Sequence, residues 1–182
     1  MSEIQVASRY AKSLIDLAQE ENSLEAIKTD IEAFIAVCKS NPQLVAVLKN
    51  PIIGPAKKTA ILDNLFGSNM HKIVLSFFRI VTTKMRGEIL YATAKEFINE
   101  YNRRKGIFKA TVTSASPLSE ENKTQIIAKI EEAVHGRVIL KAKVDPSLIA
   151  GFVLNVGDKQ FDASIASKLN KLKKEFSQKV IA

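Results

Sequence analysis

The feature that most constrains the fold of this chain is a change of hydrophobic period at Gly106. Before Gly106, apolar residues recur at spacings of three and four, as on one face of an α-helix. After it, apolar and polar residues alternate, as in a half-buried β-strand. No repeat or low-complexity segment separates the two parts. The sequence therefore predicts a mainly α chain, with a six-helix bundle over residues 1–105 followed by a small α/β domain over residues 106–182.

The predicted helices of the first part are bounded by proline and glycine, which interrupt the apolar pattern at short intervals. Asn41-Pro42 is typical of a helix start, with asparagine as the cap and proline in the first turn. Arg103, Arg104 and Lys105 occupy the last turn before Gly106, which favours a helix end with a glycine cap. The predicted helices span residues 4–21, 23–39, a segment beginning at 42, 56–66, 70–84 and about 88–105.

The second part alternates between the two periods. Ser119, followed by two glutamates, is a good helix start, and Gly157-Asp158 is typical of a tight hairpin turn. The predicted order is a strand at 107–114, a helix at 119–135, a strand at 138–144, a hairpin of 152–156 with 159–161, and a helix at 164–178.

The glycines of the second part raise the question of a phosphate-binding loop. Gly151 and Gly157 are separated by five mostly apolar residues and are followed by Asp158, which would repel a phosphate. A phosphate-binding loop needs a closing lysine and a serine or threonine instead. These glycines are interpreted as turn residues, and we find no catalytic constellation, cofactor motif or metal-ligand spacing. Cys38 is expected to be a buried apolar residue.

The net charge of +8 and the pI of about 9.5 favour an anionic partner or a membrane neighbourhood. The charge is spread evenly over both parts of the chain. A basic adaptor that binds nucleic acid is the alternative interpretation. Tryptophan is absent, and no predicted helix has a purely basic face with base-reading polar residues, which disfavours it.

Two helices of the first part carry more apolar surface than a bundle needs. The helix at 70–84 is apolar nearly all round, and the first helix has a second stripe of small residues, Ala7, Ala11, Ile15 and Ala18. The surplus predicts a groove that receives another helix. A deeply buried central helix explains the segment at 70–84 equally well.

Three segments carry a family resemblance: "SRYAKSLIDLA" (8–18), "RKGIFKATVTSASPLSEE" (104–121) and "VDPSLIAGFVLNVGDKQFDASIASKLNKLKKEF" (144–176). Together they resemble the delta subunit of bacterial F-type ATP synthase. The resemblance implies a non-catalytic stator subunit that links the catalytic head to the peripheral stalk and resists rotor torque during proton-driven ATP synthesis. It also implies a peripheral position on the cytoplasmic face of the bacterial inner membrane, through the complex and without membrane insertion. No nucleic-acid partner is expected.

The same resemblance implies two partner-binding sites. Helices 1–105 would bind the N-terminal helices of alpha subunits, and residues 106–182 would bind the C-terminal region of the stalk b subunits. Together with the surplus apolar surface, it places an alpha-subunit groove at Ala7, Tyr10, Ala11, Leu14, Phe78 and Val81. The stalk contact is expected at Phe152, Leu169, Leu172 and Phe176.

Overall fold

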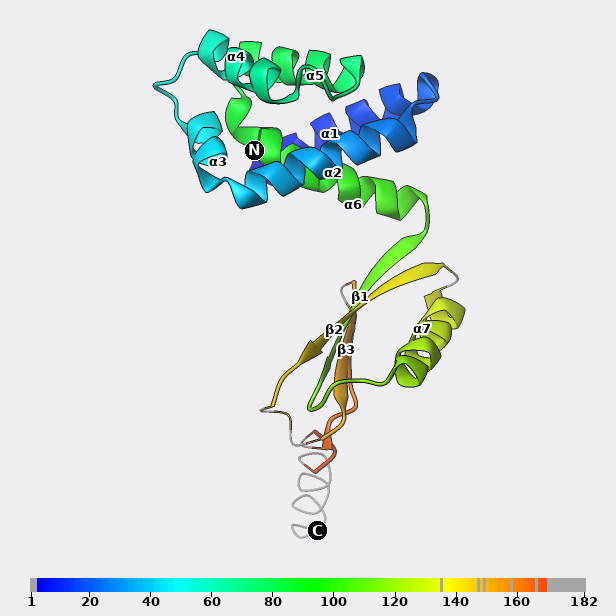
Figure 1. Ribbon diagram of the computed structural model, residues 1–182. Coiled ribbons are helices and arrows are strands. Elements are labelled where there is room, and N and C mark those ends of the chain that lie inside the picture. Colours follow the sequence, from blue (N-terminus) through cyan, green and yellow to red (C-terminus); the bar gives the residue numbers. More distant parts are fainter. Residues whose placement is uncertain are drawn as a thin grey trace, which may run out of the picture. The chain divides into compact units, whose positions relative to one another are not determined.

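The computed structural model describes residues 3–134, 136–146, 148, 150–157, 159–165 and 167–169. The chain divides into two compact units, Met1–Arg104 and Lys105–Ala182. Each unit is described by itself, and Figure 1 shows the elements of both. The division falls one residue before the expected boundary at residue 105.

The first unit is helical throughout, and the second is a sheet with a helix, so the predicted fold class is confirmed. Predicted and observed helix ends in the first unit differ by about two residues or fewer, and the start of the last helix differs in kind. There a single 3-10 turn, η1 (Gly87–Ile89), precedes α6. The α-helices are α1 (Glu3–Glu20), α2 (Leu24–Ser40), α3 (Pro42–Lys49), α4 (Pro55–Phe66), α5 (Lys72–Thr83) and α6 (Leu90–Arg104).

The core of the first unit combines close helix packing with an aromatic cluster. Helix α6 packs along α1 and α2, and α4 packs along α5. Phe34 of α2 lies at the centre of the cluster, with its ring 4.8 Å from that of Phe78 and 5.5 Å from that of Phe66. Such tilted and edge-to-face pairs are favourable beyond the apolar area that they bury. The cluster joins α2, α4 and α5.

Two polar side chains close helix ends, and one of them corrects the sequence interpretation. Lys58 is buried, and its Nζ donates a 2.7 Å hydrogen bond to the carbonyl oxygen of Leu48. This bond satisfies a carbonyl in the last turn of α3. Asn41 is the N-cap residue of α3 with Pro42 in the first turn, as expected, but its side chain makes no capping bond there: its Nδ2 donates to the carbonyl of Val37 at the end of α2.

The second unit is a four-stranded mixed sheet in the order β2-β1-β3-β4. Strand β1 (Ile107–Ser114) pairs in parallel with β2 (Arg137–Val144), and helix α7 (Glu120–Val134) connects the two. Strand β3 (Phe152–Val156) pairs antiparallel with both β1 and β4 (Lys159–Asp162). The Ser119 Oγ accepts from the Asn122 amide at 3.2 Å, as expected for a helix cap.

The two faces of this sheet differ, because successive side chains of a strand point to opposite sides. Ala110, Val112, Val138, Leu154 and Val156 form one face and pack with Ile130 of α7 in the core. Helix α7 lies on this side of the sheet (Figure 1). The other face is formed by the alternate residues of each strand.

Two further observations complete the fold. No single described helix is long and apolar enough to cross a membrane, and the one helix pair that meets the length and hydropathy criteria jointly, α2 with α3, is bent by 99°.

The predicted helix at 164–178 is described at residues 165 and 167–169, which are helical. The remainder of that prediction lies outside the described residues.

Candidate partner-binding surfaces

Most of the residues expected to line the alpha-subunit groove belong to the core. Five of them are at most 2% exposed, and so the expectation that they line an open groove is wrong. The small stripe of α1 is covered within the bundle, where small side chains allow a neighbouring helix to approach closely. The five buried residues are Ala7, Ala11, Leu14, Phe78 and Val81.

Tyr10, the sixth expected residue, lies at the surface and contacts a different residue of α5. Its ring packs edge-to-face against Phe77, with centroids 6.2 Å apart. The Arg86 Nη1 donates a 2.9 Å hydrogen bond to the Tyr10 hydroxyl, and the guanidinium lies 5.8 Å from the ring centroid. Tyr10 is therefore held in one orientation between α1 and α5.

This contact joins two partly exposed apolar stripes, which we call the α1–α5 surface: Tyr10 and Leu17 of α1 with Ile73, Phe77 and Ile80 of α5. Residues seven apart, or four and three apart, lie on one side of a helix. Leu17 is 42% exposed and Ile80 is 56% exposed, while the other three are half-buried. Exposed apolar residues at this spacing, with aromatic rings among them, are typical of surfaces that bind helices.

Sequence reasoning missed Phe77 and Ile80 as surface residues for a physical reason. Helix α5 is apolar nearly all round, so its hydrophobic pattern does not show which side faces the core. Phe77 and Phe78 are adjacent, and one residue corresponds to about 100° of rotation around a helix. The contact of Phe77 with Tyr10 settles the orientation.

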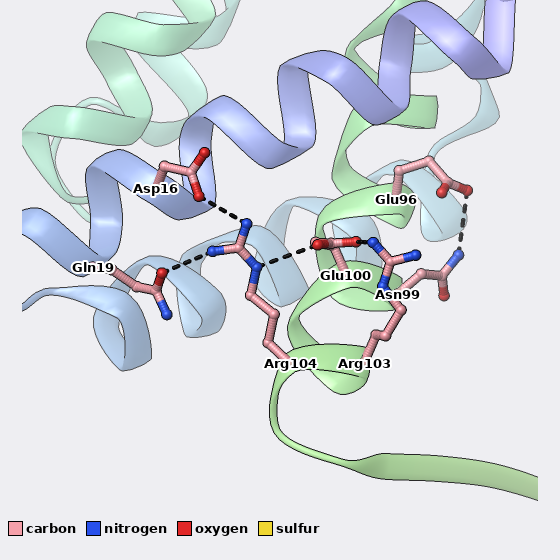
Figure 2. A network of polar contacts seen from close by, with 7 residues as sticks. All are labelled: Asp16, Gln19, Glu96, Asn99, Glu100, Arg103 and Arg104. Atoms are coloured by element: carbon pink, nitrogen blue, oxygen red, sulfur yellow. Dashed lines mark hydrogen bonds and ion pairs between the residues drawn. The ribbon is translucent and has the colours of Figure 1, made fainter.

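A polar network fixes the last turn of α6 to α1, directly before the chain enters the second unit (Figure 2). The Arg104 guanidinium donates to Asp16 and Gln19, each at 2.7 Å, and its Nε donates to Glu100 at 3.2 Å. Arg103 also donates to Glu100. Burial raises the pKa of Glu100, but the two guanidinium groups outweigh this effect and hold the pKa below its ordinary value. Glu100 is therefore ionised at neutral pH, and the network stays paired.

The second unit carries an open apolar cavity of about 570 Å³ beside α7. Phe152, an expected stalk-binding residue, is half-buried and lines this cavity. Leu169 is exposed and is not among the lining residues, while Leu172 and Phe176 lie outside the described residues. The walls are almost entirely apolar: Phe108, Ile126, Lys129, Ile130, Ala133, Val134, Phe152, Leu154, Val156, Gly157 and Phe161.

The described cysteine, histidine and turn glycines, which could in principle belong to a catalytic or ligand site, occupy structural positions. Burial raises the pKa of the Cys38 thiol to about 11, so it is not a thiolate at neutral pH. The His71 ring accepts from the Ile73 amide at the start of α5. Gly151 and Gly157 have φ of +89° and +57°, which is the geometry of turn glycines. The described residues contain no group of three or more metal-ligating side chains, and His135 lies outside them.

A two-unit chain with an apolar surface on each unit is typical of a protein that joins other proteins together. The model of the family "ATP synthase delta (OSCP) subunit" matches residues 6–176. The ATP synthase subunit delta of Cytophaga hutchinsonii is 40% identical, over 100% of this chain and 99% of that protein. That of Amoebophilus asiaticus is 38% identical, over 97% and 96%.

A solved structure supports the same fold. A chain in the cryo-EM structure of the Toxoplasma gondii mitochondrial ATP synthase hexamer superposes with a TM-score of 0.73 at 19% identity, covering 93% of this chain and 96% of that chain. The chain belongs to the ATP synthase delta (OSCP) subunit family. It is a non-catalytic stator component of an F-type ATP synthase, and the nucleic-acid alternative is not favoured.

Proposed function

We propose that this subunit connects the catalytic head to the peripheral stalk through one surface on each unit. The first unit binds the N-terminal helices of alpha subunits at the α1–α5 surface. The second unit binds the C-terminal region of the b subunits at the apolar cavity beside α7. The contact between Tyr10 and Phe77 is the observation that carries the alpha-subunit assignment, because it joins two exposed apolar stripes into one surface.

The α1–α5 surface suits an amphipathic helix. Such a partner places apolar residues at three- and four-residue spacing against an apolar surface. Aromatic residues held in one rotamer are the usual centres of binding energy, because little side-chain entropy is lost on association. Tyr10 meets this requirement, since Phe77 and Arg86 already hold its ring and its hydroxyl.

The cavity of the second unit suits bulky apolar side chains from a stalk helix. Its opening exposes Phe161, and its walls carry almost no polar group. Burial of one leucine-sized side chain contributes about 1.5–3 kcal/mol. Two or three such side chains from the stalk would give an attachment that depends little on salt.

Two attachments on one chain explain how the subunit resists torque. When one partner dissociates, the partner that is still bound keeps the subunit near the vacated site, so rebinding is effectively intramolecular. An ion pair between Arg104, in the last turn of α6, and Asp16 fixes this turn to α1. The end of α6 can therefore transmit force between α1 and the start of the second unit. Through the complex, the subunit lies peripherally at the cytoplasmic face of the inner membrane.

The test of the alpha-subunit site is the change Phe77→Ala. We expect it to weaken binding of a peptide from the alpha N-terminus at least about tenfold, or about 1.4 kcal/mol, because the aromatic centre of the surface is lost. Fluorescence anisotropy of the labelled peptide measures this. The control is Ile52→Ala, which removes an apolar side chain that is 90% exposed in the connection between α3 and α4, away from the α1–α5 surface. Native affinity in the Phe77→Ala protein, with its unfolding midpoint unchanged, would refute the assignment.

A further inference from the structure

The second unit has a basic sheet face on the side opposite α7, against which no described helix packs. The register places Arg137 beside Ile107, Lys141 beside Thr111, and Lys143 beside Thr113. Lys109 lies on the same side of β1 as Thr111. We call the side chains of Lys109, Arg137, Lys141 and Lys143 the basic sheet face.

These four cations follow two neighbouring strands: Lys141 and Lys143 are alternate residues of β2, and Lys109, whose partner is Ile139, lies diagonal to Arg137 and Lys141. Alternate residues of a strand are about 6.6 Å apart, and neighbouring strands are about 4.8 Å apart. All four residues are exposed. Among the described residues, none of the four has a carboxylate partner.

Acidic groups on this face lie at its far edge. Of the described strand residues on this side of the sheet, Asp162 of β4 alone is acidic. Its carboxylate accepts from the Ser164 amide at 2.9 Å and from the Ser167 hydroxyl. These bonds hold the pKa of Asp162 below its ordinary value. Asp162 is thus engaged with the helix start after β4, two strands away from β1.

We propose that the basic sheet face binds an acidic segment of a protein partner. Charge complementarity selects the partner, because carboxylates spaced along a polypeptide can pair with cations at strand spacing. Thr111 and Thr113 add hydroxyl groups between the charges, and Ile139, which is 55% exposed, adds apolar contact. The surface lies on the opposite side of the sheet from the apolar cavity, and so it is separate from the proposed stalk site.

The composition of the face favours a protein over a nucleic acid. Binding of single-stranded nucleic acid relies on aromatic rings that stack with bases. Phe108, Phe152 and Phe161 all belong to the α7 side of the sheet, where they line the cavity. The basic face has no aromatic residue among its described strand positions.

The experiment measures binding of a short fluorescent poly-L-glutamate peptide to the full chain at physiological ionic strength, by anisotropy. The double change Lys141→Glu/Lys143→Glu is expected to weaken binding at least tenfold, and Lys141→Gln/Lys143→Gln by an intermediate factor. The control, Lys39→Glu/Lys57→Glu, has the same net charge but alters exposed residues of α2 and α4, and less than a twofold change is expected. Circular dichroism verifies that each variant is folded.

Three results would overturn the proposal. The first is equal weakening by the two charge-matched variants, which would show that net charge alone drives binding. The second is absence of saturable binding to the peptide. The third is tighter binding to a single-stranded oligonucleotide, or to vesicles of phosphatidylcholine and phosphatidylglycerol, than to the peptide. The test uses neither the alpha nor the b subunit, so its outcome is independent of the proposed attachments.

Discussion

Replacement of Phe78 by alanine is expected to lower the free energy of unfolding of the first unit by about 3–5 kcal/mol. Phe78 is almost fully buried, and its ring contacts those of Phe34 and Phe66. The substitution leaves a cavity where α2, α4 and α5 meet, and rigid helices can close it only in part. Urea unfolding followed by circular dichroism measures the change.

The neighbouring residue provides the matched control for this prediction. Phe77→Ala removes the same atoms one position away, where the side chain is only half-buried at the α1–α5 surface. We expect it to cost much less stability and to act mainly on partner binding. If Phe77→Ala destabilised the protein as much as Phe78→Ala, the observed orientation of α5 would be wrong.

Gly151→Ala is expected to be the most damaging small substitution in the second unit. Gly151 has φ of +89°, where an L-residue is strained by about 1–2 kcal/mol. A Cβ at this position would also lie 2.5 Å from the Ala163 carbonyl oxygen and 2.9 Å from the Ser164 Cα. Both contacts are with backbone, which cannot rotate away, so we expect a total cost of at least about 3 kcal/mol.

Gly157→Ala separates the two contributions to this effect. Gly157 also has a positive φ, of +57°, but a Cβ there would meet no atom within 4 Å. Its replacement should therefore cost only the backbone strain, about 1–2 kcal/mol. Thermal unfolding of both variants gives the comparison. Equal destabilisation by the two changes would contradict the close packing of Gly151 against the segment after β4.

Much of the fold could be predicted from the sequence, because its determinants are local. Proline at positions 42 and 55 and glycine at 67 and 106 mark helix boundaries, and the change of period at Gly106 separates helices from strands. The Ser119 cap was predicted correctly for the same reason. The position of Asn41 at the start of α3 was predicted correctly, but the partner of its side chain was not, because that side chain can bond either to the preceding helix or to the following one.

The binding surfaces were harder to predict, because they depend on contacts between distant segments. The small stripe of α1 indicates close approach of a helix, but Ala11 is covered by the bundle itself. The orientation of α5 depends on the pairing of Tyr10 with Phe77, which are far apart in sequence. Phe152 was expected at a binding site, yet the cavity that it lines depends on the position of α7 over the sheet.

The basic sheet face illustrates the same limit. The alternation of lysine with apolar residues over 138–144 predicts a strand, but not which cations lie side by side. The parallel register between β1 and β2 pairs Lys109 with Ile139, and so places Lys109 on the same face as Arg137, Lys141 and Lys143 and diagonal to the first two. Sheet register is a property of the assembled domain, and strand order here does not follow chain order.

The central claim is that one chain holds two partners at the same time on separate surfaces. The most direct test mixes the full chain with a peptide from the alpha N-terminus and the C-terminal region of the b subunit, and measures mass by light scattering after size-exclusion chromatography. The account predicts a ternary complex, in which saturation with one partner leaves the affinity for the other unchanged. Displacement of the b region by the alpha peptide would contradict it.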